Sequence, residues 1–365
     1  MNTKTTLNTK TTLKRKPVSL VLGAAAALAL SLLLPAPASA QPFGSWRIFE
    51  RPTQGYIRIP HSPALNPTGA ITIEGWVNVT DPGGCSNIIG KGYQTAWWIG
   101  ICGTTLRSYL DGNASVRDGG RLPPNEWTHF AVTYDGANRR HYINGELVAT
   151  FAQAGAMDTN TQQVRIGSDV DYANFSPEGS INEIRLWNVA RTIEQIRSTI
   201  NVPITTAQPG LVAVWAGGGP NDVVGPHDGT VIDTVPALTF PVGGACITTA
   251  TTLCLLDRYA VTIDWRTSPP TTVPPSGGQG MVAPLITAQS GIFWFFSASN
   301  WEVMVKVLNG CGLNNRYWVF SAATTNVSYR VEVFDHDGAA NKIFFNYPGP
   351  PAPAVTDTNA FATCP

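Results

Sequence analysis

The strongest constraint on the fold is the alternation of side chains between Ile181 and Trp187, because a strand places successive side chains on opposite faces. One face of this predicted strand carries Asn182, Ile184 and Leu186, and the other carries Ile181, Glu183, Arg185 and Trp187. Similar alternating runs bounded by turn residues recur along the chain, and none is spaced as in a βαβ unit. These features predict an all-β protein with antiparallel sheets.

A short helix is predicted directly after this strand. Thr192 can cap its first turn, and Gln195, three residues later, supplies the second half of a capping box. Ile193, Ile196 and Ile200 then fall on one face of the helix. Because that face is apolar, we expect the helix to pack against another element.

Two successive hairpins are predicted upstream, between Glu126 and Thr150. The first turns at residues 135–138, and the second turns at Asn144-Gly145, where both central residues of a tight turn need positive φ. Before them, the stretch Gly55 to Val79 predicts two strands around a Pro-rich bend. In the second of these strands, Ile71, Ile73 and Gly75 alternate with Thr72, Glu74 and Trp76.

In their order, these motifs resemble the laminin-G-like, concanavalin A-like jelly roll of bacterial secreted proteins, in the subgroup related to pentraxins. The matching stretches, between Gly55 and Asn201, are YIRIPHSPALNPTGAITIEGWV, IIGKG, EWTHFAVTYDG, RHYINGELV, IGSD and GSINEIRLWNVARTIEQI. The resemblance implies a β-sandwich with a ligand surface at its rim or concave face. Because one fold carries many activities, the function must be argued from a site.

We divide the chain into four parts: 1–40, a signal peptide; 41–234, the jelly roll with an edge strand at Leu211 to Trp215; 235–245, a linker rich in Pro and Gly; and 246–365, a second, smaller domain. The last part carries six short strands about ten residues apart, which predicts an Ig-like β-sandwich. Its first long strand alternates cleanly at Tyr259, Val261, Ile263 and Trp265. The Pro-rich run Thr267 to Gly280 is therefore expected to be a loop inside this domain. The domain is similar to a C-terminal module of many secreted bacterial proteins, and the resemblance supplies no function for it.

The first forty residues have the pattern of a secretory signal peptide. A basic segment with Lys14 and Arg15 precedes the apolar run Val18 to Leu34, and Ala38-Ser39-Ala40 is a small-residue cleavage signal. An uncleaved membrane anchor is the alternative, since the apolar run is long for a signal core. We expect a secreted protein, extracellular or periplasmic, with no membrane span after cleavage.

Charge and cysteine content support export and argue against nucleic-acid binding. Without residues 1–40 the chain carries 19 basic and 24 acidic residues, so phosphate binding has little electrostatic support. The six cysteines are even in number and bound for an oxidising compartment, which predicts disulfides rather than a zinc site. Sequence leaves the connectivity open, and local spacing suggests the pairs Cys85 with Cys102, Cys246 with Cys254, and Cys311 with Cys364.

Two groups of residues are candidates for ligand binding. Asp169, Asp171 and Asn174 supply oxygen ligands of the kind that calcium prefers, although an ordinary Asp/Asn turn explains the same residues. The aromatic side chains of Tyr93, Trp97, Trp98 and Tyr172 could stack on a sugar ring near the rim, with core packing as the alternative. Calcium is thus the one cofactor that the sequence suggests.

Catalytic signatures are weak in this sequence. Polysaccharide hydrolases use paired carboxylates, whereas Glu74 and Glu183 each stand alone on a strand, and we expect Glu74 to face solvent. No Gly-x-Ser-x-Gly motif accompanies the histidines. We therefore expect a non-catalytic recognition protein that binds a glycan or an extracellular protein. A structural or adhesive surface protein whose domains dock partners is one alternative, and a hydrolase or lyase of the same fold is another.

Overall fold

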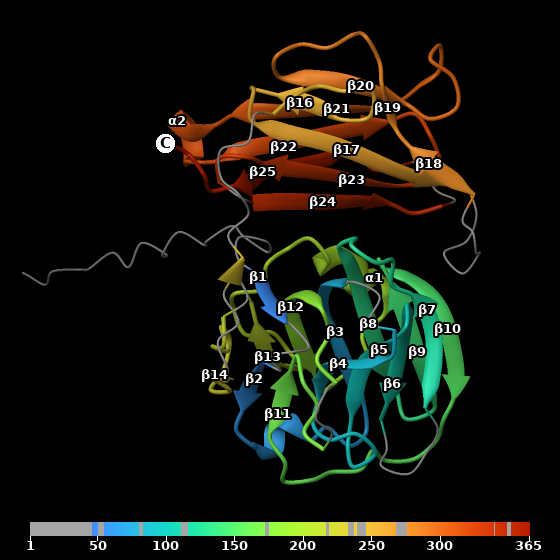
Figure 1. Cartoon of the computed structure of the whole chain (residues 1–365), viewed down its shortest axis with the longest axis vertical. Coiled ribbons are helices and arrows are strands. Elements are labelled where there is room, and N and C mark those ends of the chain that lie inside the picture. The colour runs from blue at the N-terminus through green and yellow to red at the C-terminus, as the bar shows by residue number, and fades with distance from the viewer. Residues whose placement is uncertain are drawn as a thin grey trace, which may run out of the picture. The chain divides into compact units, whose positions relative to one another are not determined.

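The computed structural model describes residues 46–49, 55–79, 83–110, 116–171, 175–216, 219–232, 237–238, 246–267, 276–338, 340–348 and 352–365. These residues form β-strands, the two short helices α1 (Ile193–Thr199) and α2 (Cys311–Asn314), and the 3-10 turn Pro63–Leu65 (Figure 1). None of the helices in the described part is long and apolar enough to cross a membrane. The predicted signal peptide lies outside the described residues.

The first sandwich contains two antiparallel sheets. In sheet A the strand order is β10 (Glu146–Ala152), β9 (Asn138–Ile143), β8 (Thr128–Tyr134), β3 (Ile71–Val79), β12 (Gly179–Trp187), β1 (Trp46–Phe49) and β15 (Ala237–Leu238), with β13 (Leu211–Trp215) also paired to β12. In sheet B it is β14 (Thr230–Ile232), β2 (Tyr56–Ile59), β11 (Val164–Ile166), β4 (Cys85–Gly90), β5 (Trp98–Cys102), β6 (Thr105–Tyr109) and β7 (Arg117–Arg121). The segment predicted as an edge strand is β13, and β15 lies within the stretch predicted as a linker.

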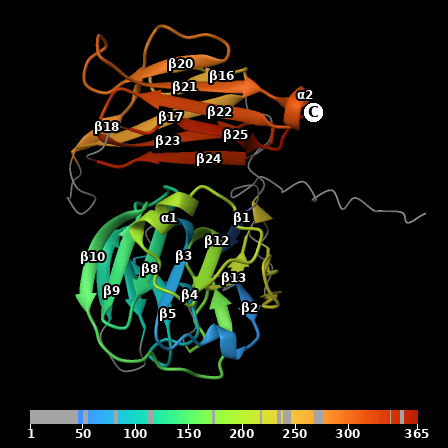
Figure 2. The same cartoon turned by 180° about the vertical axis from the view of Figure 1, so that it is seen from behind.

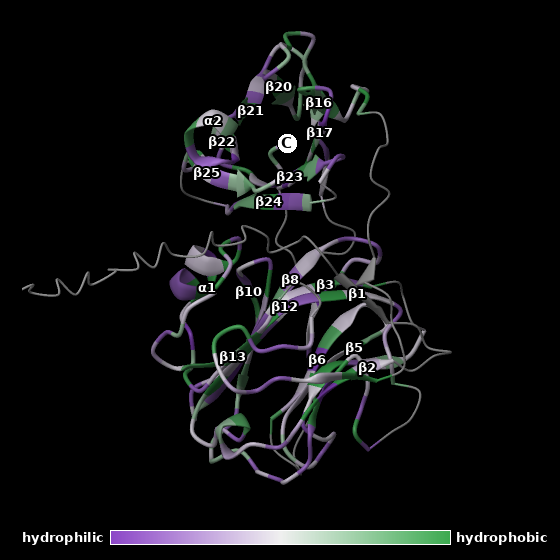
Figure 3. Cartoon of the chain, turned by 90° about the vertical axis from the view of Figure 1, so that its left-hand side faces the viewer, coloured by the Kyte–Doolittle hydropathy of each residue, from purple (hydrophilic) through white to green (hydrophobic). Residues whose placement is uncertain are grey.

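The two sheets share one hydrophobic core. Sheet A contributes Ile71, Ile73, Phe130 and Val132, and sheet B contributes Ile57, Ile88, Ile99 and Leu106. Figure 3 looks along the layers, with β12 and β13 on one side and β2, β5 and β6 on the other. The Asn144-Gly145 hairpin is confirmed, since the two residues have φ of 50° and 74°. These observations confirm the predicted β-sandwich of antiparallel sheets.

Strand β12 departs from the strict alternation that its sequence predicts. Its pairing with β3 shifts register between Asn182 and Arg185, and Glu183 there has a φ of 53°. Ile181 and Ile184 both face the core as a result, although strict alternation placed them on opposite faces. Gly75 allows this bulge, because a Cβ at that position would lie 2.4 Å from Ile184 Cδ1.

Helix α1 follows β12 as predicted and lies on the outer face of sheet A (Figure 2). The capping box is present: the Thr192 N–H donates to Gln195 Oε1 at 2.8 Å, and the Gln195 N–H donates to Thr192 Oγ1 at 3.3 Å. Ile196 is fully buried against Ala131 and Tyr142 of the sheet. The predicted apolar face of the helix therefore has its partner.

The second sandwich also has two sheets. Sheet C consists of β16 (Leu253–Leu255), β17 (Tyr259–Arg266), β23 (Ser328–Asp335) and β24 (Ala340–Asn346), with β18 (Gly277–Gln279) also paired to β17; sheet D consists of β19 (Met281–Val282), β20 (Ser290–Trp294), β21 (Trp301–Asn309), β22 (Tyr317–Ala323) and β25 (Val355–Phe361). Their inner faces enclose a separate core with Tyr259, Val261, Val305 and Val319. The Ig-like topology and the domain boundaries stay predictions.

All six cysteines are paired in the combinations that local spacing suggested. The disulfides are Cys85–Cys102, Cys246–Cys254 and Cys311–Cys364, at sequence separations of 17, 8 and 53 residues. The first joins opposite positions of the neighbouring strands β4 and β5. The third holds α2 to the end of the chain, beyond β25. Because every thiol is used, a cysteine-based zinc site has no ligands.

We expect His141 on β9 to make the stability of this fold sensitive to acid. Its Nδ1–H donates to Gly119 O at 3.0 Å and its Nε2 lies 2.7 Å from Ser108 Oγ, so the neutral ring satisfies both partners. Burial lowers the pKa of His141 to about 4. The unfolded chain binds the proton near pH 6.5, so we expect stability to fall as the pH drops from about 6.5 to 4, by up to about 3 kcal/mol.

Urea unfolding of the wild type and His141→Gln between pH 4 and 8 would measure this dependence. We expect the variant to lose less stability than the wild type over the acid window. The two profiles should run parallel above about pH 7, where the histidine is neutral in both states. Parallel profiles across the whole range would contradict this role of His141.

Candidate ligand-binding site

The outer face of sheet B carries a group of aromatic side chains. Tyr93, Trp98 and Tyr109 meet edge to face, with ring centroids 4.4 to 6.0 Å apart. The Tyr93 and Tyr109 hydroxyl oxygens are 2.6 Å apart. Tyr93 is half-buried, whereas Trp98 is fully buried and Tyr109 nearly so. Of these three, Tyr93 is therefore the ring that a ligand could reach without rearrangement.

Trp98 lies flat on the sheet, and two glycines make this possible. A Cβ at Gly100 would lie 2.0 Å from a carbon of the Trp98 ring, and a Cβ at Gly90 would lie 2.7 Å from Trp98 Cδ1. Such distances are far below normal van der Waals contact, so a side chain at either position would displace the indole. The Trp98 ring thus forms a flat aromatic floor, by which we mean the base of the candidate site on the outer face of sheet B.

Two buried polar atoms beside this floor have no hydrogen-bond partner among the described residues. They are Trp98 Nε1, a donor, and Asn87 Oδ1, an acceptor. The Asn87 amide is fixed, because its Nδ2 donates to Ser168 O at 2.5 Å and to Arg165 O at 3.3 Å. The ideal Cβ position of Gly90 lies 2.7 Å from Trp98 Cδ1 and 3.0 Å from Asn87 Oδ1, so both groups border one spot on β4.

The segment that follows β11 covers this spot. The Asn87 N–H donates to Phe175 O at 2.7 Å, and Ser86 Oγ donates to Ser176 O at 3.3 Å. The Phe175 ring lies 6.5 Å from that of Tyr93, centroid to centroid. A ligand would reach the two unpaired atoms only after this segment moved. Tyr172, which the sequence also proposed for ligand binding, lies outside the described residues.

Trp97 does not belong to this face. It is fully buried in the core of the first sandwich, and its Nε1 donates to Leu65 O at 3.0 Å. Core packing, the alternative considered for each aromatic residue, therefore explains Trp97. Its neighbour Trp98 points the other way, as expected for successive residues in extended backbone.

Asp169 and Asp171, proposed as calcium ligands, contribute to a tight turn. Asp169 Oδ1 accepts the Asp171 N–H at 2.7 Å, and Asp171 Oδ1 accepts from Gln162 Nε2 at 2.6 Å. Arg165 Nη1 donates to Asp169 O at 2.7 Å. Asn174 lies outside the described residues, and the part of the chain that is described holds no group of three or more His, Cys, Asp or Glu able to share a metal ion. Calcium binding stays a prediction.

A buried lysine in the IIGKG motif was not singled out from the sequence. Lys91 Nζ lies 3.0 Å from His61 Nδ1 and donates to Gln162 O. Burial lowers the pKa of Lys91 to about 8. Asn160 Nδ2 donates to Lys91 O at 2.6 Å and so joins the same polar group. The motif therefore links three loops at the rim of sheet B, and a structural role explains it.

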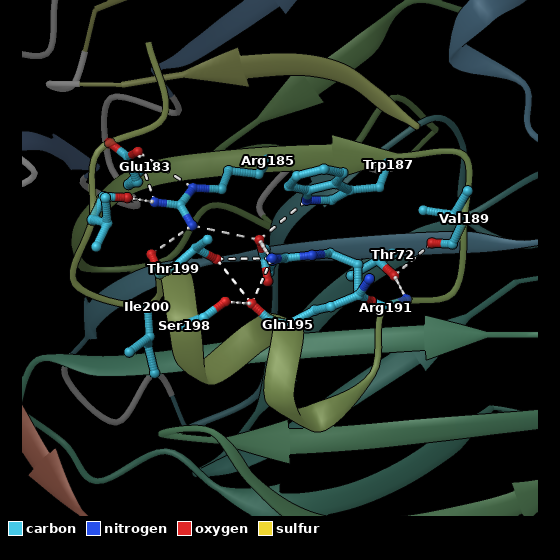
Figure 4. Close-up of polar contacts among 12 residues, drawn as sticks. Thr72, Glu183, Arg185, Trp187, Val189, Arg191, Gln195, Ser198, Thr199 and Ile200 are labelled. Atoms are coloured by element: carbon cyan, nitrogen blue, oxygen red, sulfur yellow. Dashed lines mark hydrogen bonds and ion pairs between the residues drawn. The ribbon is translucent and has the colours of Figure 1, made fainter. Parts of the chain in front are cut away.

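The two acids considered for catalysis are buried and bound to arginines. Figure 4 shows one of them, Glu183, beside Arg185. Glu74 Oε1 accepts from Arg191 Nη1 and, at 3.1 Å, from Trp187 Nε1, and it lies 3.5 Å from Arg185 Nη1. Glu183 Oε1 accepts from Arg185 Nη2 at 3.0 Å. The expectation that Glu74 faces solvent is wrong, because α1 and the chain around it cover this part of sheet A.

The same arginines hold helix α1 in place. Arg185 donates to Thr199 O at 3.0 Å, and Arg191 donates to Gln195 O at 2.6 Å (Figure 4). Arg185 also donates to Val202 O at 2.8 Å. Both carboxylates thus have cationic partners and neither lines a groove. Burial raises the pKa of Glu183, although Arg185 opposes this shift. The arrangement serves folding and offers no solvent-accessible pair of acids.

Comparison with known proteins agrees with this fold. Residues 51–197 match the model of the Laminin_G_3 family, described as the concanavalin A-like lectin/glucanases superfamily. Pappalysin-1 of Mus musculus is 40% identical over 81 residues, which are 20% of this chain and 5% of pappalysin-1, and the Homo sapiens protein is 36% identical over 81 residues. The chain thus spans about 5% of the length of these curated relatives.

Two solved structures resemble the chain at low sequence identity. A candidate carbohydrate-binding protein from Bacteroides ovatus has a TM-score of 0.47 at 21% identity, over 55% of this chain and 62% of its own. A heptameric SAP-like pentraxin from Limulus polyphemus has a TM-score of 0.40 at 16% identity, over 53% of this chain and 92% of its own.

Replacing the buried Glu74 should strongly destabilise the first sandwich. Glu74→Gln removes a negative charge that faces Arg185 and Arg191, and breaking a buried ion pair typically costs about 3–5 kcal/mol. Chemical unfolding followed by tryptophan fluorescence would measure the loss. As a control, Glu194→Gln changes an exposed glutamate in the first turn of α1 and should have a much smaller effect. Equal losses for the two variants would contradict the importance of the network.

Proposed function

We propose that this chain, whose residues 51–197 form a laminin-G-like domain of the concanavalin A-like superfamily, is an exported, non-catalytic protein that binds a glycan. The proposed site is the outer face of sheet B around Tyr93, Trp98 and Asn87. The observation that carries this proposal is the unpaired donor and acceptor, Trp98 Nε1 and Asn87 Oδ1, beside a half-buried tyrosine ring.

A sugar fits the chemistry of this face. One hydroxyl group can both donate and accept, so it could accept from Trp98 Nε1 or donate to Asn87 Oδ1, and adjacent hydroxyls could satisfy both atoms. The ring of Tyr93 offers an apolar surface on which the C–H face of a sugar can stack. Because buried polar groups without partners are costly, a ligand that pairs them would recover free energy. That gain would offset part of the cost of displacing Phe175.

Separate observations support two further parts of the proposal, namely that the protein is exported and that it is not a catalyst. Glu74 and Glu183 are each bound by arginine, so neither is available as a free acid or base. The three disulfides are typical of oxidising compartments. Calcium assistance rests on Asp169, Asp171 and Asn174, and we propose it as an addition that glycan binding does not require.

A glycan array probed with the purified protein, with calcium and with chelator, would test the proposal. We expect binding to at least one glycan, weakened about tenfold or more in Trp98→Phe, which keeps a flat ring and loses the donor. Tyr93→Ala should weaken binding through loss of stacking. Trp97→Phe is the matched control, since it removes an indole N–H in the core and should leave affinity unchanged.

The outcomes separate the two parts of the proposal. No binding to any glycan, with or without calcium, would contradict the function. If Trp98→Phe and Trp97→Phe weaken binding equally, the glycan does not bind on the outer face of sheet B. If binding is identical with calcium and with chelator, the proposed role of calcium is contradicted and the proposed glycan site is not affected.

A further inference from the structure

The outer face of sheet D carries partly exposed apolar side chains around β21. On β21, Val303, Val305 and Val307 point into the core, so Met304, Lys306 and Leu308 point outward. The register places Met304 between Ile292 and Ala322, Lys306 between Ser290 and Phe320, and Leu308 beside Trp318. Met304 is 37% exposed. Exposed apolar faces of this kind often mark binding sites.

Part of this face is hollowed. A cavity of about 310 Å³ lies over β21, β22 and the beginning of β25. Its lining includes Met304, Leu308, Phe320, Ala354 and Val355. The volume is at the lower end of the range for small-molecule sites, about 300–1,000 Å³. The hollow is therefore suited to a compact ligand and not to the flat contact area of a folded protein.

Lys306 is the one charged residue in this lining, and it makes no ion pair with any described residue. Its side chain is half-buried between Ser290 and the apolar Phe320, with Met304 and Leu308 on either side along β21, and this packing limits its hydration. An anionic group on a ligand would complement it. A sugar fits less well, because the lining is mostly apolar and only Lys306, Ser321 and Thr356 carry polar side chains that could bind several hydroxyl groups.

We propose that this hollow binds a small amphipathic carboxylate. Its apolar body would lie on Met304, Leu308 and Phe320, and its carboxylate would accept from Lys306 Nζ. The proposal is independent of the glycan site, because it concerns the other sandwich and a different ligand chemistry.

Calorimetric titration of the purified chain with decanoate and with decanol would test this. The two probes share an apolar body and differ in charge, so we expect decanoate to bind at least tenfold more tightly. Lys306→Gln should abolish that preference, and Lys306→Arg should retain it. Leu308→Asp should weaken both probes, whereas Leu313→Asp, at a position 80% exposed on α2 outside the hollow, should change neither.

Thermal unfolding of each variant would show that it is folded before it is titrated. Equal affinity for decanoate and decanol in the wild type would overturn the proposal, because it would indicate general apolar adsorption. An unchanged preference in Lys306→Gln, a loss in Leu313→Asp as large as in Leu308→Asp, or no binding of decanoate at millimolar concentration would each overturn it too.

Discussion

The first sandwich depends on a carboxylate buried between two guanidinium groups. Glu74 comes from β3, Arg185 from β12 and Arg191 from the start of the helical segment, so one cluster of charges joins three parts of the chain. Arg185 also binds the Thr199 carbonyl at the end of α1, and Arg191 binds the Gln195 carbonyl within it, which keeps the helix on the outer face of sheet A. Since a buried charge without a partner is very unfavourable, the three charged side chains must become buried together when the chain folds.

Local patterns predicted much of this architecture. The capping box at Thr192 and the Asn144-Gly145 hairpin needed only neighbouring residues, and both are present. The bulge at Glu183 was not predictable, because it depends on the close approach of Gly75 from another strand. The burial of Glu74 likewise depends on the chain that returns over it after β12. Strands β18 and β25 lie in segments whose composition resembles loops, so pattern alone did not reveal them.

The candidate site was partly visible in the sequence. Trp98 was proposed because two neighbouring residues of a strand point to opposite faces, and Tyr93 because it could lie near the same rim. Asn87 and Tyr109 were not proposed. Tyr109 lies opposite Trp98 in the pairing of β5 with β6, and such cross-strand register is a tertiary property. Asn87 becomes notable only through the bonds that fix its amide and leave its oxygen unpaired. A single unpaired atom has no signature in one sequence.

The flat orientation of the Trp98 ring ties the residue at position 98 to the residue at position 100. As long as the indole occupies the space above position 100, that position is closed to every residue larger than glycine, and position 90 is constrained in the same way. A relative with a side chain at either position would need a smaller residue or a different rotamer at position 98. We therefore expect the three positions to change together among related chains, so that the floor of the site is inherited as a unit.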